Sequence, residues 1–143
     1  MRRIFVDTAH LLGVLSPRDN LHASAVSVAA DLSHAGDLEF VTTHLVVAEL
    51  LTALARRGGE VRERATAYVE SFYAQPSVVV VERSGALFER ALHLYRDRQD
   101  KAYSLVDCVS MVVVCRDLEI TDVLSSDHDF EQEGFAILLR VPA

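Results

Sequence analysis

The stretch Ile4-Phe5-Val6-Asp7-Thr8 places a carboxylate directly after a short run of apolar residues. A run of this kind is typical of a strand that is buried on both faces of a sheet. A lone carboxylate at the end of such a strand costs free energy unless something pairs with it. Asp7 is therefore a candidate for a functional site, and the alternative is that it caps a helix that begins at Thr8.

Similar apolar runs alternate with helical segments along the rest of the chain. The clearest is Ser77–Glu82, which contains four consecutive valines. Strands that alternate with helices, in runs too apolar to face water, predict an α/β fold with a parallel sheet covered by helices on both faces. We expect strands at 4–7, 38–41, 77–82, 120–124 and 136–141, and helices at 8–14, 21–35, 44–57, 60–74, 84–98 and 104–117.

Length and composition favour one globular domain that covers residues 1–143. Half of the 143 residues are hydrophobic, and the apolar runs are shorter than the roughly 18 residues that a membrane span needs. Asp7 and His10 interrupt the apolar segment that a signal peptide would need. Cys108 and Cys115 are expected to be buried small hydrophobes in a reducing compartment. These features predict a cytoplasmic protein without a membrane segment.

The net charge of −7 argues against tight, non-specific binding of nucleic acid, because phosphate contacts require positive charge. Two features weaken this argument. Several of the acids are candidate metal ligands, and a bound cation reverses the local field. The bases are almost all arginine, and they cluster in Arg56-Arg57, Arg62–Arg64 and Arg96–Lys101. The negative charge also leaves room for a basic protein partner.

Two further acids stand inside apolar helical segments. Glu49 is the only formally charged residue from His44 to Ala55, in a helix that is apolar on nearly every side and is therefore expected to be buried. Asp107 is the only charge between Ser104 and Cys115, although its spacing from Ser104 also fits a capping box.

The segment Ser125-Ser126-Asp127-His128-Asp129-Phe130 supplies the last acids, which alternatively start a short helix or turn. Asp7 and Asp127 follow two predicted strands, and the helices with Glu49 and Asp107 begin near the same edge of the sheet. Sites in parallel sheets form beyond the carboxyl ends of the strands. Four carboxylates gathered there would bind a hard divalent cation, which predicts a metal-dependent enzyme.

The histidines contribute less to this site. His44 and His128 are near it and are expected to be solvated or capping residues, with contact to the substrate as the alternative. The others show no metal-ligand spacing and are expected on the surface or on helix faces, at positions 10, 22, 34 and 93.

Four segments together resemble the PIN domain family, and within it the VapC-like ribonucleases of toxin–antitoxin systems. They are Ile4–Thr8, Thr43–Leu50, Ser104–Cys108 and Ser125–Phe130, and the last has serine where threonine is commoner in the family. Each motif is weak by itself. All four in this order, spread over nearly the whole chain, are strongly specific.

The resemblance implies a three-layer α/β/α sandwich and an Mg²⁺- or Mn²⁺-dependent endoribonuclease in which a metal-activated water hydrolyses RNA phosphodiesters. It also implies a homodimer and a small antitoxin that covers the acidic cleft. The implied catalytic metal ligands are Asp7, Glu49, Asp107 and Asp127, with Thr8, Ser125 and Asp129 as supporting residues around them.

Two alternatives differ from a nuclease. The first is a non-catalytic PIN-like module that binds RNA or protein, and the presence of all four acids argues against it. The second is a flavodoxin-like or receiver-type domain, in which an aspartate after a strand accepts phosphate. Such a domain does not need Glu49 within a helix, and the only lysine, Lys101, does not follow a late strand.

Overall fold

A central parallel sheet organises the computed structural model of the chain, which describes residues 1–82 and 85–141. The five strands of the sheet lie in the order β3-β2-β1-β4-β5, and every neighbouring pair is parallel. The carboxyl ends of the strands therefore point to one edge. The strands are β1 (Arg2–Val6), β2 (Leu38–Thr43), β3 (Val78–Val81), β4 (Asp122–Leu124) and β5 (Ala136–Ile137).

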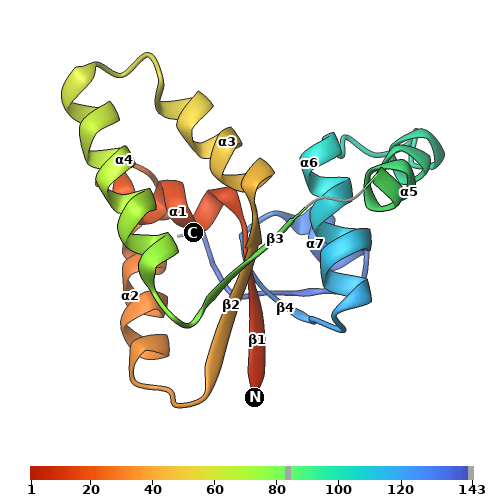
Figure 1. Cartoon of the computed structure of the whole chain (residues 1–143), viewed down its shortest axis with the longest axis horizontal. Coiled ribbons are helices and arrows are strands. Elements are labelled where there is room, and N and C mark those ends of the chain that lie inside the picture. Colours follow the sequence, from red (N-terminus) through yellow and green to blue (C-terminus); the bar gives the residue numbers. More distant parts are fainter. Residues whose placement is uncertain (83–84, 142–143) are drawn as a thin grey trace.

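Helices flank this sheet on two sides and complete the predicted three-layer α/β/α arrangement. Figure 1 shows α1, α2 and α4 to one side of the strands and α5 and α6 to the other, with α3 rising from the carboxyl end of β2. The helices on the first side are α1 (Thr8–Leu15), α2 (His22–Ser33), α3 (His44–Leu54) and α4 (Gly59–Ala74). Those on the second side are α5 (Gly85–Asp97), α6 (Leu105–Cys108), the π-helix η1 (Val109–Arg116) and α7 (His128–Gln132).

Most predicted elements are present, but two predictions about burial were wrong. The valine run forms the edge strand β3, and Val79 is 38% exposed, because β-branched residues favour strands wherever they lie in a sheet. Helix α3 buries only one face, and Leu51 on its other face is 37% exposed. Both elements are therefore less buried than their apolar composition predicted.

Element boundaries also differ from the predictions. β2 continues two residues beyond the expected 38–41, and β5 covers only the first two residues of the expected 136–141. The predicted helix 104–117 changes from α-helix to π-helix after Cys108, and its apolar sequence carries no signal for such wider turns. Ser84, the expected start of the helix 84–98, lies outside the described residues.

The core surrounds β1, in which Ile4, Phe5 and Val6 have at most 1% of their surface exposed. Cys108 and Cys115 are both buried and free, as predicted. A central strand packed on both faces cannot shift without opening cavities, so the residue that follows it has a fixed position. That residue is Asp7.

Gly13 allows α1 and α2 to pack closely, because a Cβ atom there would lie 3.0 Å from the Cβ of Ala25 on α2. We expect Gly13→Val to lower the free energy of unfolding by about 1–3 kcal/mol through overpacking. The control is Gly36→Val, since a Cβ at Gly36 meets no atom within 4 Å. Urea denaturation of both variants tests this prediction, and equal losses of stability would contradict it.

Candidate metal centre

Asp7 lies between β1 and α1 with only 6% of its surface exposed. It occupies the N-cap position of α1, but its side chain makes no capping hydrogen bond. Instead, the hydroxyl of Ser125 donates to Oδ2 of Asp7 over 2.7 Å. The capping alternative therefore does not explain the Asp7 carboxylate.

The Asp7 carboxyl group is poorly suited to carry a charge when no cation is bound. Its pKa is raised to about 7, first by burial and then by the negative charges of Asp107 and Glu49. Hydrogen bonds from Ser125 and the Thr8 backbone act in the opposite direction and are outweighed. A nearby positive charge would stabilise the ionised form.

Three acids of the predicted segments lie close to one another in space. One ligand atom each from Asp107, Asp127 and Asp129 lies within 4.8 Å of the other two. Burial, followed by charged neighbours, raises the pKa of both Asp107 and Asp129. This group includes Asp129, which the resemblance implied only as a supporting residue, and it does not include Asp7 or Glu49.

Helix caps hold two of these acids in place. Ser104 and Asp107 form the predicted capping box, in which Oδ2 of Asp107 accepts from the Ser104 N–H over 3.0 Å. Asp127 caps α7 by accepting from the Asp129 N–H over 2.9 Å. Each cap uses one oxygen of its carboxylate, so the structural and the functional interpretations of these residues are compatible.

Ser125 joins the first acid to the last ones. Its buried hydroxyl donates to Asp7 and accepts from the Asp127 N–H over 3.1 Å. The serine thus keeps a hydroxyl where threonine is commoner in the family. The Thr8 hydroxyl, which the resemblance implied as a supporting group, donates to the Val46 carbonyl of α3 over 3.3 Å.

Glu49 lies on α3 at the same edge of the sheet. Its charge contributes to the raised pKa values of both Asp7 and Asp107. The structure therefore brings the four predicted acids and Asp129 into one group of interacting charges, in which Asp107, Asp127 and Asp129 lie within 4.8 Å of one another.

The donor set fits a hard divalent cation. All candidate ligands are carboxylates, and oxygens on opposite sides of an Mg²⁺ ion lie about 4.2 Å apart. One oxygen from each of Asp107, Asp127 and Asp129 lies within 4.8 Å of the other two, which allows all three to approach one ion. Within residues 1–82 and 85–141, no ion pair to Arg, Lys or His neutralises Asp7, Glu49, Asp107, Asp127 or Asp129.

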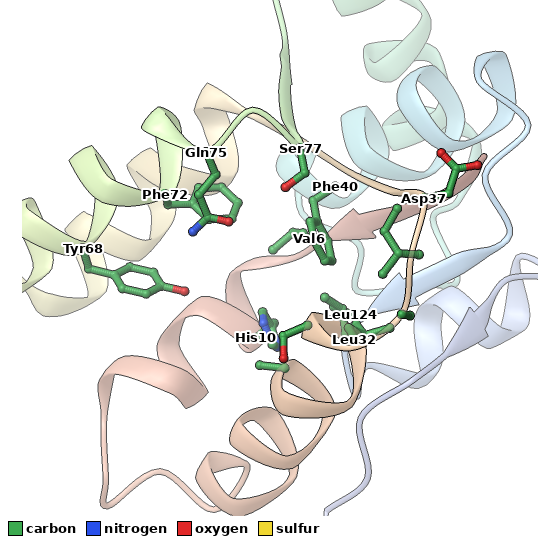
Figure 2. Close-up of a pocket in the computed structure, with 14 residues that line it drawn as sticks. Val6, His10, Leu32, Asp37, Phe40, Tyr68, Phe72, Gln75, Ser77 and Leu124 are labelled. Atoms are coloured by element: carbon green, nitrogen blue, oxygen red, sulfur yellow. The ribbon is translucent and has the colours of Figure 1, made fainter.

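His10 lies on a face of α1, one of the two expected places, and this face is buried, since only 7% of His10 is exposed. It lines a cavity of about 460 Å³ between the sheet, α2 and α4, together with Tyr68 and Phe72 (Figure 2). Its Nδ1 atom is buried without a hydrogen-bond partner among the described residues. Burial lowers the pKa of His10 to about 4, so its ring is neutral at physiological pH.

The histidines near the site have structural partners. Nδ1 of His44 lies 3.1 Å from the Tyr73 hydroxyl, and Nδ1 of His128 lies 2.5 Å from a Glu131 oxygen. Both histidines are exposed, in line with the prediction. Glu133, whose side chain is only 7% exposed, was not predicted, because one glutamate in a polar segment gives no signal of burial.

A comparison with protein families identifies the chain. The profile of the PIN domain matches residues 4–135. The chain belongs to the PIN domain family. This confirms the resemblance drawn from the four acidic segments, and a comparison with curated protein sequences finds no significant match.

Solved structures agree with the family. VapC20 from Mycobacterium tuberculosis, described as a sarcin–ricin loop cleaving toxin, is 26% identical and superposes with a TM-score of 0.82 over 96% of this chain and 99% of its own. VapBC2 from Rickettsia felis, bound to a promoter DNA fragment, is 10% identical with a TM-score of 0.63 over 94% and 96% of the two chains. FitAcB from Neisseria gonorrhoeae is 16% identical with a TM-score of 0.60 over the same shares. The last two support the fold alone.

None of the helices within the described part of the chain has the length and apolar character needed to cross a bilayer.

Proposed function

We propose that this PIN domain, with residues 1–143 as one domain, is an Mg²⁺- or Mn²⁺-dependent endoribonuclease and the toxin of a toxin–antitoxin pair. One observation supports this most strongly. Five acids gather at the carboxyl edge of the sheet, and none of them forms an ion pair with a basic side chain among the described residues. PIN domains related to VapC are nucleases, which supports hydrolysis of RNA for this chain.

The metal ligands that we propose are Asp7, Glu49, Asp107 and Asp127. A divalent cation held there supplies Lewis-acid polarisation of a phosphodiester and lowers the pKa of a water nucleophile. Ser125 orients the Asp7 carboxylate by its hydrogen bond, and the two helix caps orient Asp107 and Asp127. Asp129 stands close enough to bind the ion directly or to hold its water.

Similar structures support the proposed toxin role and partners. The description of VapC20 as a toxin that cleaves the sarcin–ricin loop supports RNA as the substrate class. The resemblance to VapC-like toxins, among them the similar VapC20, supports a small antitoxin partner. An arginine of such a partner would pair well with the acidic group. The implied homodimer is part of the same proposal, and sedimentation velocity of the purified protein tests it.

We expect purified protein to cleave single-stranded or hairpin RNA in Mg²⁺ or Mn²⁺ and to stop when EDTA is added. The products should carry a 5′-phosphate and a 3′-hydroxyl, which end-labelling detects. Cleavage that continues in EDTA would contradict the metal requirement. RNA binding without cleavage in either metal would instead favour the non-catalytic module.

A further inference from the structure

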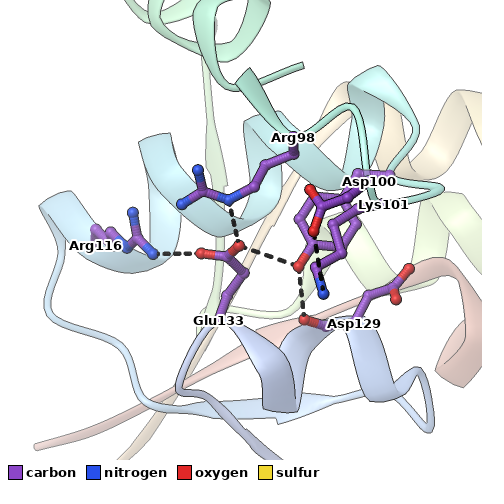
Figure 3. A network of polar contacts seen from close by, with 7 residues as sticks. Arg98, Asp100, Lys101, Arg116, Asp129 and Glu133 are labelled. Carbon is purple, nitrogen blue, oxygen red and sulfur yellow. Dashed lines mark hydrogen bonds and ion pairs between the residues drawn. The ribbon is translucent and has the colours of Figure 1, made fainter. Parts of the chain in front are cut away.

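Glu133 ends α7 as a buried carboxylate with three hydrogen-bond donors. Its side chain is only 7% exposed. It accepts from Arg98 Nε over 2.9 Å, from Tyr103 Oη over 3.0 Å and from Arg116 Nη2 over 2.7 Å (Figure 3). Charge-assisted hydrogen bonds of this kind are stronger and more directional than neutral ones.

Two of the three donors precede α6, the helix that carries Asp107, in the sequence, and the third follows it. Arg98 follows α5, and Tyr103 directly precedes Ser104, the cap of α6. Arg116 is the last residue of η1, which continues α6. Through Glu133, the end of α7 is therefore tied to the start of α6 and to the end of η1.

These ties connect the elements that carry the closest acids. Asp107 belongs to α6, whereas Asp127 and Asp129 belong to the start of α7. Carboxylates this close repel one another when they are ionised and no cation is bound. Contacts elsewhere must hold the two helices together. The Glu133 contacts lie about one helical turn after Asp129 (Figure 3), and Tyr103 Oη also donates to the Asp129 carbonyl over 3.5 Å.

We propose that Glu133 is a positioning residue that sets the spacing of Asp107, Asp127 and Asp129 and thereby the affinity of the site for Mg²⁺ or Mn²⁺. It does not touch the ion. This inference rests on the metal site of the proposed function. Residues that orient metal ligands typically change metal affinity about 10–100-fold when they are mutated.

The variants separate positioning from a simple effect of charge. Glu133→Gln removes a negative charge, which by itself weakens cation binding. Arg116→Gln removes a positive charge, so a charge effect predicts tighter binding, whereas lost positioning predicts weaker binding. Tyr103→Phe removes the contacts of Oη with Glu133 and with the Asp129 carbonyl and leaves the charge unchanged, so any loss of affinity there reports positioning.

A matched control is the ion pair between α5 and the residue after η1. Arg90 of α5 makes a bidentate ion pair with Asp117, next to Arg116, over 2.6 and 2.9 Å. This pair joins α5 to the end of η1 but does not include α7. Asp117→Asn therefore removes one negative charge, as Glu133→Gln does, from an exposed ion pair that does not include α7.

The experiment measures Mn²⁺ affinity of the full chain through the electron paramagnetic resonance signal of free Mn²⁺, at a temperature where circular dichroism shows each variant folded. We expect the dissociation constant to rise about tenfold in Glu133→Gln and severalfold in Tyr103→Phe and Arg116→Gln. Asp117→Asn should stay within about twofold of wild type. The Mn²⁺ concentration for half-maximal RNA cleavage should rise in parallel, while kcat at saturating Mn²⁺ is retained.

The outcomes distinguish this inference from the proposed function. If the wild-type protein does not bind Mn²⁺, the metal site itself is wrong. If the wild type binds Mn²⁺ and folded Tyr103→Phe and Glu133→Gln bind it equally well, the positioning role is wrong. Should Glu133→Gln fail to fold, Tyr103→Phe decides, and tighter binding by Arg116→Gln would assign the effect to charge and overturn positioning.

Discussion

Replacing Asp107 with asparagine is expected to lower the rate of RNA cleavage by about a hundredfold or more while the protein stays folded. A metal ion contributes several kcal/mol of transition-state stabilisation, and about 2.7 kcal/mol corresponds to a hundredfold in rate. Asparagine keeps an oxygen that can accept from the Ser104 N–H, so the cap of α6 is preserved. Initial rates of cleavage of a labelled RNA at fixed Mn²⁺ measure the loss.

Asp7→Asn is expected to lower the cleavage rate by the same amount, because it also removes a proposed metal ligand. The variant should stay folded, since an asparagine oxygen can still accept from Ser125. The control is Asp100→Asn, in which an exposed acid outside the group is changed. It should keep wild-type activity. Full activity in both Asp7→Asn and Asp107→Asn would show that these acids do not form the catalytic site.

The stability of the metal-free protein should depend on pH through two groups with opposite effects. The pKa of Asp7 is raised to about 7, so its contribution to stability is present below about pH 4 and is lost as the pH rises towards 7. The pKa of His10 is lowered to about 4, so its contribution is present above about pH 6.5 and is lost as the pH falls. The two effects oppose each other between pH 4 and 7.

Single variants should separate these effects. Between pH 4 and 8 in EDTA, Asp7→Asn should gain up to about 4 kcal/mol in free energy of unfolding relative to wild type. His10→Leu should gain up to about 3 kcal/mol relative to wild type as the pH falls from 7 to 4. His34→Leu, at an exposed position, is the control for the histidine.

Urea denaturation at several pH values measures these differences. Adding Mn²⁺ at pH 8 should stabilise wild type more than Asp7→Asn, because only the native wild-type site keeps its full ligand set. A difference between Asp7→Asn and wild type that does not change with pH would contradict the raised pKa of Asp7. A pH-independent difference for His10→Leu would contradict the neutral, buried ring.

Much of the fold could be predicted from local patterns. Alternating apolar strands and helices predicted the parallel sheet, and Asp7 and Asp127 were expected at its carboxyl edge because each follows a strand. The capping box of Ser104 and Asp107 could also be predicted, since a cap depends only on residues within one turn. The predictions of burial for β3 and α3 were wrong, because the composition of an element does not show whether it lies at the edge or in the centre of the fold.

The candidate site divides in the same way. The order of residues was enough to show which residues are acidic, which of them follow strands, and the PIN family to which the chain belongs. The packing of separate elements was needed to show that Asp129 joins Asp107 and Asp127, that Ser125 connects Asp7 to them, and that Glu133 accepts hydrogen bonds from two arginines. The reason is physical: distances between side chains on separate elements, and the burial that shifts their pKa values, arise only when those elements pack together.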